Sequence, residues 1–298
     1  VIRDKSMLEY ILSASNMRQA YKQVVSNKGA AGIDGMGVDE LHDHLCANWS
    51  AIKRQIQHGA YIPCAVRKVE IPKPNGGKRM LGIPTVTDRL IQQAIAQTLS
   101  ALYDTCFSDN SFGFRPGRSA HQAVERALEY FASGSRKVVE MDLEKFFDRV
   151  NHDKLMSILC ECITDKPLLK LIRRYLQAGI MEGGVASTRT EGTPQGSPLS
   201  PILSNILLDK LDKELERRGL HFVRYADDCS IYVKSQRSAE RVLQSVTRYL
   251  EDKLHLKVNR DKSKVSRPDE CHLLGFGFRY KKGGCVPRVS ERAKERLK

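Results

Sequence analysis

Tyr225-Ala226-Asp227-Asp228 lies between two short β-prone runs, one from His221 to Arg224 and the other from Ser230 to Val233. Two such runs around a turn predict a β-hairpin with two carboxylates at its tip. Adjacent aspartates repel each other, and no turn requires two of them. A divalent cation between their oxygens and a phosphate would make the pair favourable. Because aspartate is common in turns, an acidic turn without a metal is the alternative.

A second β-prone run, Lys137 to Leu143, carries Asp142 near its C-terminal end. Asp142 and Asp227 are 85 positions apart (227 − 142), so only the fold can bring them together. Two metal ions about 4 Å apart can hold an attacking hydroxyl and a leaving oxygen in line. Such a site needs carboxylates from more than one strand. We therefore predict Asp142 and Asp227 as bridging ligands, Asp228 as a more peripheral ligand and the backbone carbonyl of Leu143 as a further oxygen. Asp142 alone would also fit a strand end or a helix cap.

Motifs spread along nearly the whole chain resemble a reverse transcriptase, most closely one encoded by a bacterial group II intron. Each motif is weak by itself, and their order along the chain makes the resemblance specific. The motifs are Gly32 to Gly35, Arg67 to Lys73, Lys78 to Pro84, Ser111 to Ser119, the Asp142 strand, Gly192 to Pro201, the aspartate hairpin, Lys257 to Ser263 and Leu273 to Phe276.

The expected fold is α+β. From residue 137 onward the order is strand, helices, hairpin, helix and strand, which predicts an antiparallel sheet with helices packed on one face. The resemblance identifies this part as the palm of a polymerase right hand. The expected domains are an N-terminal extension with fingers over 1–130, a palm over 131–290 with a helical fingers insertion near 152–185, and the start of a thumb or maturase domain at 291–298.

The resemblance also implies residues that bind the incoming nucleotide. Arg67, Lys73 and Arg79 match the basic positions of a hinged hairpin that closes over a triphosphate and stabilises the leaving pyrophosphate. Phe147, five residues after Asp142, matches an aromatic ring that collides with a 2′-hydroxyl and so favours deoxynucleotides. A solvated cation and a core ring are the respective alternatives.

Gly192 to Pro201 combines glycines and prolines ahead of a helix, which gives a stiff segment that a base pair can approach closely. The resemblance implies that Gln195 lies near the nascent base pair. It also implies that Lys262 protonates pyrophosphate as a general acid, with a plain surface lysine as the alternative. The residues that it assigns to template and primer are Pro194, Gly196, Leu274 and Gly275, and we expect the last two in a strand over 272–280.

The 298-residue chain has a formal net charge of +14, which suggests a polyanionic partner. Lys and Arg outnumber acids by seven to one from Lys53 to Arg79 and by twelve to five from Asn259 to Lys298, with solvated surface as the alternative. No apolar run is long enough to span a bilayer, and we see no secretory signal. The eight cysteines contain no CxxC pair, which fits reduced thiols. We expect a bacterial cytoplasmic protein without a membrane partner.

We therefore expect an RNA-directed DNA polymerase of a mobile group II intron that also binds intron RNA as a splicing maturase. It would use two Mg²⁺ ions, or Mn²⁺ in their place, with dNTPs, an RNA template and a DNA primer, and it would be inactive where a thumb is lacking. The alternatives are a retron- or CRISPR-type reverse transcriptase and an RNA-binding splicing cofactor that does not need polymerase activity. The sequence does not decide the oligomeric state, a homodimer included.

Overall fold

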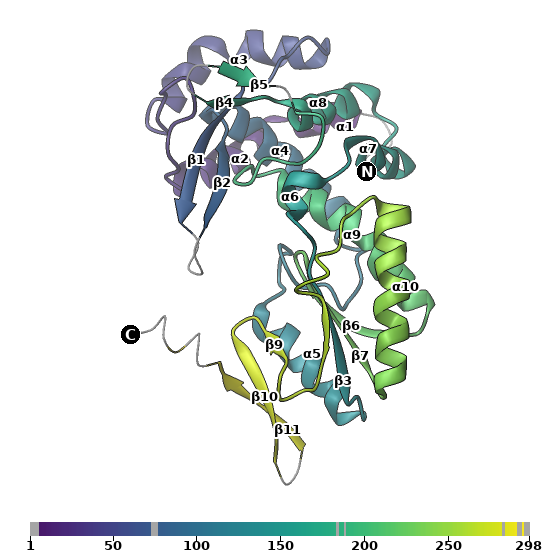
Figure 1. The fold of residues 1–298 in the computed structure, drawn as a ribbon. Coiled ribbons are helices and arrows are strands. Elements are labelled where there is room, and N and C mark those ends of the chain that lie inside the picture. Colours follow the sequence, from purple (N-terminus) through teal and green to yellow (C-terminus); the bar gives the residue numbers. More distant parts are fainter. Residues whose placement is uncertain are drawn as a thin grey trace. The chain divides into compact units, whose positions relative to one another are not determined.

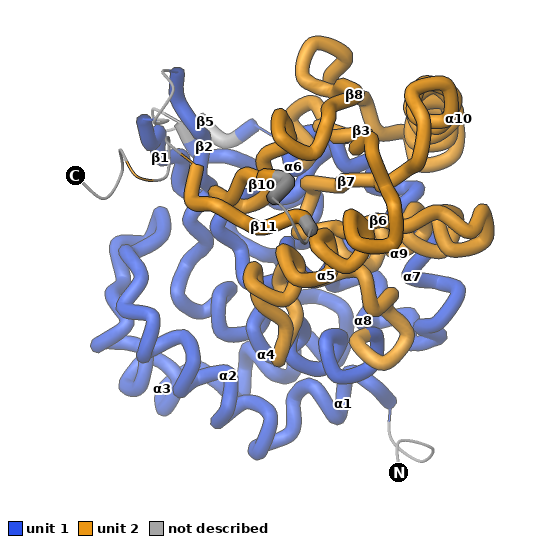
Figure 2. Tube along the Cα trace, turned by 90° about the horizontal axis from the view of Figure 1, so that it is seen from below, with its two compact units in different colours: residues 1–103, 147–203 blue, residues 104–146, 204–298 orange. Residues whose placement is uncertain are grey.

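The computed structural model describes residues 6–72, 77–182, 185–187, 189–281, 284–290 and 294. The chain forms two compact units, shown in two colours in Figure 2. The first unit comprises residues 1–103 and 147–203, and the second comprises residues 104–146 and 204–298. Each unit is therefore built from two stretches that are far apart in the sequence.

The first unit is mostly helical and is organised around α4 (Val86–Tyr103; Figure 1). Residues on nearly every side of α4 are buried, as expected of a helix enclosed by other elements. Asn151 caps α7 (His152–Cys162) and Asp165 caps α8 (Lys166–Gln177), because the side chain of each accepts a hydrogen bond from a backbone N–H of the first helical turn. The unit also contains α1 (Met7–Ile11), α2 (Ala14–Ser26) and α3 (Leu41–Gln57).

A buried carboxylate, Asp88, joins three segments of the first unit. It accepts hydrogen bonds from the hydroxyls of Tyr61 (2.8 Å), Thr85 (2.9 Å) and Tyr175 (3.1 Å) and from the backbone N–H of Cys64 (3.0 Å). Burial raises the pKa of Asp88, and the hydrogen bonds oppose that shift. The network fixes the segment that leads into β1, which begins two residues after Cys64.

The sheet of the first unit has the strand order β2-β1-β4-β5. Strands β1 (Val66–Pro72) and β2 (Lys78–Ile83) form an antiparallel hairpin, with Arg67 opposite Ile83. Strand β4 (Ile180–Glu182) pairs with β1 in parallel and with β5 (Val185–Ser187) in antiparallel orientation. The hairpin expected for the basic residues is therefore present, although Lys73 at its tip lies outside the described residues.

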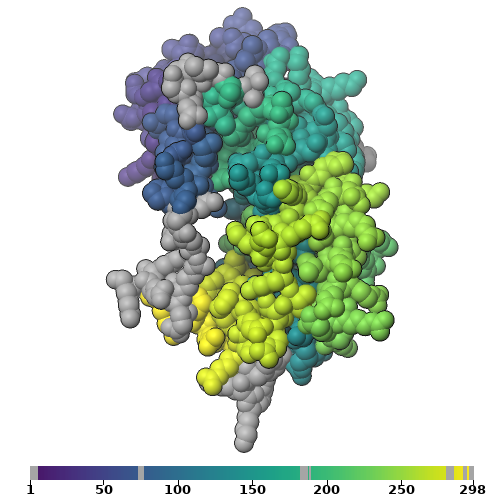
Figure 3. Space-filling view, viewed as in Figure 1, coloured from purple at the N-terminus to yellow at the C-terminus, as the bar shows by residue number. Residues whose placement is uncertain are grey.

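The sheet of the second unit has the order β6-β7-β3-β8, and each pair of neighbours is antiparallel. The strands are β3 (Lys137–Met141), β6 (His221–Tyr225), β7 (Asp228–Val233) and β8 (Lys264–Ser266), and the helices are α5 (Ala120–Ala132), α9 (Ser200–Arg217, whose first turn belongs to the first unit) and α10 (Gln236–Leu254). Side chains of α10 cover much of the visible face of this unit (Figure 3). The α+β class and the antiparallel sheet are confirmed.

Helices cover this sheet on both faces, where we expected them on one. Val138 and Val139 point to opposite faces of β3, and both are fully buried. On one face, Tyr232 packs edge-on against Phe131 of α5, with ring centroids 5.2 Å apart. On the other face, Arg224 contacts α9. A small sheet of β9 (His272–Leu273), β10 (Phe276–Lys281) and β11 (Gly284–Val289) adds to the α5 side of the core.

The short helix α6 (Phe146–Arg149) lies where the chain passes from the second unit to the first. Residues 291–293 and 295–298 lie outside the described part, so the expected start of a thumb or maturase domain stays a prediction. Within the described residues, no helix is both long and apolar enough to cross a membrane.

We predict that Asp209→Asn stabilises the protein at pH 7 and not at pH 4. Burial, followed by repulsion from Asp212, raises the pKa of Asp209 to about 6, and its Oδ1 has no hydrogen-bond partner among the described residues. A carboxyl with a raised folded-state pKa binds more protons folded than unfolded, so its cost to stability appears as pH rises from about 4 to 6. After solvent screening, the gain at pH 7 should be about 1–2 kcal/mol.

The measurement is urea unfolding of both proteins at the two pH values. Asp109→Asn is the matched control, because hydrogen bonding by Arg118 lowers the pKa of Asp109. That variant should instead lose stability at pH 7. A gain for Asp209→Asn of equal size at both pH values would contradict the assignment.

Candidate functional site

The predicted aspartate hairpin is present. Strands β6 and β7 pair from His221 opposite Tyr232 to Tyr225 opposite Asp228, which leaves Ala226 and Asp227 as the two residues of the turn. Ala226 has a positive φ of 57°. This conformation places the two neighbouring aspartates at one end of the sheet.

The sheet register brings Asp142 to the same end. Strand β3 pairs with β7 up to Met141 opposite Cys229, and the next position of this antiparallel register brings Asp142 and Asp228 to the same end of the sheet. The Nζ of Lys262 lies 3.9 Å from Oδ2 of Asp142. The fold therefore gathers Asp142, the aspartate hairpin and Lys262, as the sequence led us to expect.

The electrostatics of Asp228 reflect this gathering. Crowding by protein atoms, then repulsion from Asp227 and from Asp142, raises the pKa of Asp228 to about 6, whereas Lys262 acts in the opposite direction. The residue is also exposed to solvent, which partly screens these charges. The three carboxylates therefore concentrate negative charge at this end of the sheet.

The chemistry of these donors suits a hard divalent cation, because carboxylate oxygens are the ligands that Mg²⁺ prefers. Among the described residues, however, no three His, Cys, Asp or Glu side chains are arranged to hold a metal ion as they stand. Mutual repulsion keeps carboxylates apart where no cation balances them. The ligand types present here therefore suit a divalent metal ion. The bridging, peripheral and carbonyl roles of Asp142, Asp227, Asp228 and Leu143 stay predictions.

The segment from Lys257 to Ser263 clamps the backbone around Asp142. The N–H of Asn259 donates to the Asp142 carbonyl (2.8 Å), and the Asp142 N–H donates to Oγ of Ser263 (3.0 Å). The N–H of Glu144 donates to the Lys257 carbonyl (2.8 Å). The sequence motif marked this segment, but only the structure shows that its polar residues hold the Asp142 backbone.

The residues predicted to bind the nucleotide lie in the first unit. Arg67 is on β1, and its buried Nε has no hydrogen-bond partner within the described part of the chain. Arg79 is exposed on β2. The carbonyl of Gln195 accepts a hydrogen bond from the N–H of Gly82 (2.8 Å), which ties its segment to β2. These residues and the carboxylates belong to different units, so their joint action is a proposal.

The segment from Gly192 to Pro201 is held firmly within the first unit. Its Thr193 N–H donates to the Phe147 carbonyl (2.6 Å), and Oγ of Ser200 donates to the Pro194 carbonyl (2.8 Å). Pro194 is buried, whereas Gly196 is exposed with a φ of 104°. The segment is therefore stiff, as its glycines and prolines predict, and Gly196 is its accessible point.

The two adjacent phenylalanines have different surroundings. Phe146 is 3% exposed and belongs to the core, whereas Phe147 is half-buried. This difference favours Phe147 as the ring that could meet a sugar.

Leu274 and Gly275 do not lie in a strand, contrary to our prediction. Both have positive φ values, 52° and 87°, and they form the two-residue turn between β9 and β10. Positive φ at both central positions is the mark of a type I′ hairpin turn, which interrupts the expected strand over 272–280. A contact of these residues with a primer would therefore come from a turn.

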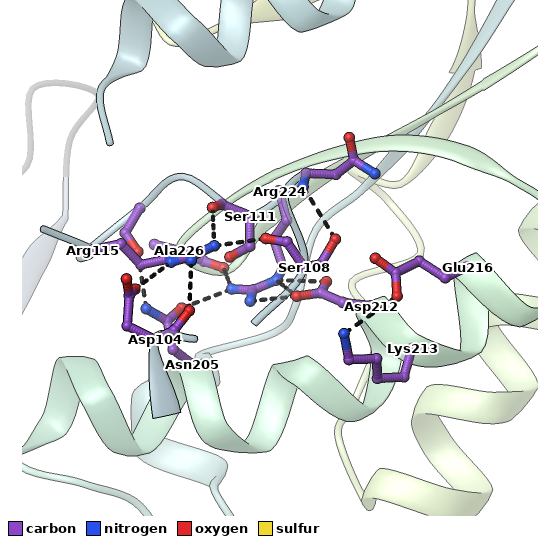
Figure 4. Close-up of polar contacts among 12 residues, drawn as sticks. Asp104, Ser108, Ser111, Arg115, Asn205, Asp212, Lys213, Glu216, Arg224 and Ala226 are labelled. Carbon is purple, nitrogen blue, oxygen red and sulfur yellow. Dashed lines mark hydrogen bonds and ion pairs between the residues drawn. The ribbon is translucent and has the colours of Figure 1, made fainter. Parts of the chain in front are cut away.

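Sequence reasoning missed a buried network beneath the aspartate hairpin (Figure 4). Arg224 and Asp212 form an ion pair of 2.6 Å in which both side chains are fully buried. Asn205 accepts a further hydrogen bond from Arg224 at 2.9 Å. Two signals were available: Arg224 interrupts an apolar strand, and Asn205 and Asp212 are seven residues apart, hence on one face of α9.

Comparisons with known proteins show what this chain is similar to. The family model described as "Reverse transcriptase (RNA-dependent DNA polymerase)" matches residues 71–278. "Protein YkfC" of Escherichia coli is 31% identical, over 93% of this chain and 82% of its own length. "Group II intron-encoded protein LtrA" of Lactococcus lactis is 29% identical over 98% of this chain, which spans 59% of that relative's length. A chain of the solved structure "Partial Cas6-RT-Cas1--Cas2 complex" is 26% identical, with a TM-score of 0.52 over 83% of this chain and 43% of its own.

Proposed function

Because the chain belongs to the reverse transcriptase (RNA-dependent DNA polymerase) family, we propose that it forms the fingers and palm of a group II intron-encoded enzyme. The enzyme copies RNA into DNA and also binds its intron RNA as a splicing maturase. The observation that carries the proposal is the meeting of Asp142 with the aspartate hairpin at one end of the palm sheet. The match to the intron-encoded relative over 98% of the chain supports the intron biology.

Reverse transcriptases generally use divalent metal ions. We propose two Mg²⁺ ions, or Mn²⁺ in their place, held by Asp142, Asp227, Asp228 and the carbonyl of Leu143. When bound, the ions supply Lewis-acid stabilisation of the primer hydroxyl and of the leaving pyrophosphate. The protein contributes the rigid sheet end that keeps the three carboxylates together.

The remaining residues bind and orient. Lys262, whose ammonium lies beside Asp142, supplies a proton to the departing pyrophosphate. Phe147 excludes the ribose 2′-hydroxyl. The guanidinium of Arg67 binds the triphosphate together with two further cations, and other residues contact bases and backbone. The residues in these further roles are Lys73 and Arg79 for the triphosphate, Gln195 for the nascent pair, and Pro194, Gly196, Leu274 and Gly275 for template and primer.

Reverse transcriptases bind RNA templates. For this chain we propose group II intron RNA, an RNA template, a DNA primer and dNTPs as partners, in the bacterial cytoplasm. The net charge of +14 supports binding of such polyanions. A CRISPR-type enzyme is the second candidate, because a chain of the Cas6-RT-Cas1 complex shares the fold at 26% identity. A splicing cofactor without polymerase activity is disfavoured, since all three aspartates are present at an electrostatic cost.

We predict that Asp142→Asn and Asp227→Asn each reduce DNA synthesis by at least about 100-fold, because each removes a charged metal ligand. Neither should lower the melting temperature, since each relieves repulsion. Primer extension on an RNA template by the full-length protein gives the rate. Asp261→Asn, at an exposed aspartate next to Lys262, is the control and should keep normal activity. Appreciable extension by either variant would remove the metal-site assignment.

We predict that Phe147→Val raises the ratio of ribonucleotide to deoxyribonucleotide incorporation by about 10-fold or more, because a smaller side chain leaves room for a 2′-hydroxyl. Single-nucleotide incorporation with each nucleotide gives the ratio. The matched control is Phe146→Leu in the core, which should lower stability and leave the ratio unchanged. An unchanged ratio in Phe147→Val would assign its ring to packing.

We predict that the chain binds folded RNA with an affinity that falls steeply as salt rises, because its Lys and Arg side chains release counterions from phosphates. Folded RNA should bind better than duplex DNA, since its shallow minor groove exposes 2′-hydroxyls. Filter binding at several salt concentrations, with a group II intron domain and an unrelated RNA of equal length as competitors, measures both effects. Equal competition by the two RNAs would leave a basic surface and argue against the maturase role.

A further inference from the structure

The turn that carries Asp227 is held in a conformation that its sequence does not favour. Ala226 is the first of the two central residues and has a φ of 57°. Turns with positive φ at that position strongly prefer glycine, because in the left-handed region a Cβ atom comes too close to the backbone. A strained residue persists only where its surroundings impose the conformation.

The side chain of Arg224 restrains this turn directly. Its NH1 group donates to the Ala226 carbonyl (2.9 Å) and to Oδ1 of Asn205 (2.9 Å), while Nε and NH2 donate to the carboxylate of Asp212 (2.8 and 2.6 Å). The Ala226 carbonyl belongs to the peptide bond that leads into Asp227. One fully buried guanidinium thus connects α9 to the backbone of a candidate metal ligand (Figure 4).

A loop encloses the turn from another side. The N–H of Phe112 donates to the Arg224 carbonyl (2.9 Å), and the N–H of Arg224 donates to the Asn110 carbonyl (2.8 Å). A Cβ atom at Gly113 would collide with the backbone nitrogen of Ala226, so only glycine allows this approach. Nδ2 of Asn205 donates to the Gly113 carbonyl (2.9 Å), which makes Asn205 a link between the loop and the arginine.

A second buried arginine fixes the loop itself. Arg115 donates from Nε to Oδ1 of Asp104 (2.7 Å) and from NH1 to the carbonyls of Ser108 (2.6 Å) and Ser111 (2.8 Å). Its guanidinium carbon also lies 5.4 Å from the centroid of the Phe107 ring. The loop is therefore rigid where it meets the turn.

A buried ion pair is a poor explanation for stability alone, because packed apolar side chains of similar volume often stabilise a fold at least as well. An apolar pair could not donate to the Ala226 carbonyl. Lysine could keep the charge of residue 224, but it lacks the planar fork that reaches Asp212, Asn205 and Ala226 together. The feature specific to arginine here is directional donation to the turn.

We propose that Arg224 is a positioning residue: through the Ala226 carbonyl it sets the orientation of Asp227 and so prepares the carboxylates for a divalent cation. The expected effect on DNA synthesis rests on the proposed polymerase function. The restraint of the turn rests only on the hydrogen bonds of Arg224 within the second unit. Asp212 and Asn205 act through Arg224 by fixing its guanidinium.

The primary test is Arg224→Lys in the full-length protein, with Arg218→Lys as the matched control. Arg218 also pairs with an acid of α9, Glu214 (2.7 Å), but within the described part of the chain its side chain contacts Ser245 and Tyr249 and not the turn. Arg224→Lys should remain folded, exchange the amide hydrogens of residues 226–229 at least about 10-fold faster, and bind Mn²⁺ about 5-fold or more weakly. In primer extension, kcat should fall while KM for dNTP stays within about 2-fold. The control should match the parent protein in all four measurements.

A second variant separates the turn contact from the ion pair. Asp212→Leu combined with Arg224→Met removes both charges, so it should fold and show the same faster exchange and weaker Mn²⁺ binding. Unchanged exchange and Mn²⁺ affinity in Arg224→Lys would overturn the proposal. Loss of the fold in Arg224→Lys would also overturn it, because the arginine would then be structural. If the parent protein itself does not bind Mn²⁺, the proposed metal site fails, and amide exchange still decides whether Arg224 holds the turn.

Discussion

Repulsion among three aspartates at one end of an antiparallel sheet is the constraint on which the rest of the second unit depends. Asp142 and the adjacent pair Asp227 and Asp228 come from two distant parts of the chain, and partial burial together with their mutual repulsion raises the pKa of Asp228. A flexible scaffold would let such carboxylates move apart. The surrounding structure prevents this by fixing their backbones, through the clamp from Lys257 to Ser263 on one strand and the Arg224 network on the other.

The Lys257–Ser263 segment and the Arg224 network consist of buried or partly buried polar groups, and most of these groups have a hydrogen-bond partner. Arg224 is fully buried, yet its hydrogen bonds reach Asp212, Asn205 and Ala226. Satisfied networks of this kind rigidify a core, whereas a partly satisfied network would destabilise it. Exceptions nearby are the Ser111 hydroxyl and Oδ1 of Asp209, which are buried and lack a partner among the described residues. The predicted cost of the Asp209 carboxylate to stability at pH 7 illustrates what the network avoids elsewhere.

The first unit holds its proposed nucleotide-binding residues by another means. The Asp88 network fixes the chain just before β1, and the bond from Gly82 to the Gln195 carbonyl joins β2 to the Gly192–Pro201 segment. Arg67 and Gln195 are thus attached to one hydrogen-bonded framework. Their side chains can therefore act on a ligand from a fixed backbone, which is what a preorganised site requires.

The sequence by itself determined the local features of this protein. Two short β-prone runs around a pair of aspartates predicted the hairpin, and the order of strands and helices predicted the α+β class, because such runs and turn chemistry are encoded over a few residues. The order of motifs likewise indicated the family before any geometry was known.

Only the tertiary structure decided the register of the strands and the hydrogen-bond partners of the buried polar residues. It aligned Asp142 with Asp228, assigned Ser263 and Asn259 to the Asp142 backbone, chose Asp212 and Asn205 for Arg224, and turned the chain at Leu274. Both faces of the palm sheet proved to be covered, since burial of Val138 and Val139 depends on what packs against them. Such choices depend on contacts between residues far apart in the chain, and no local pattern encodes which of several polar groups will meet once the core has packed.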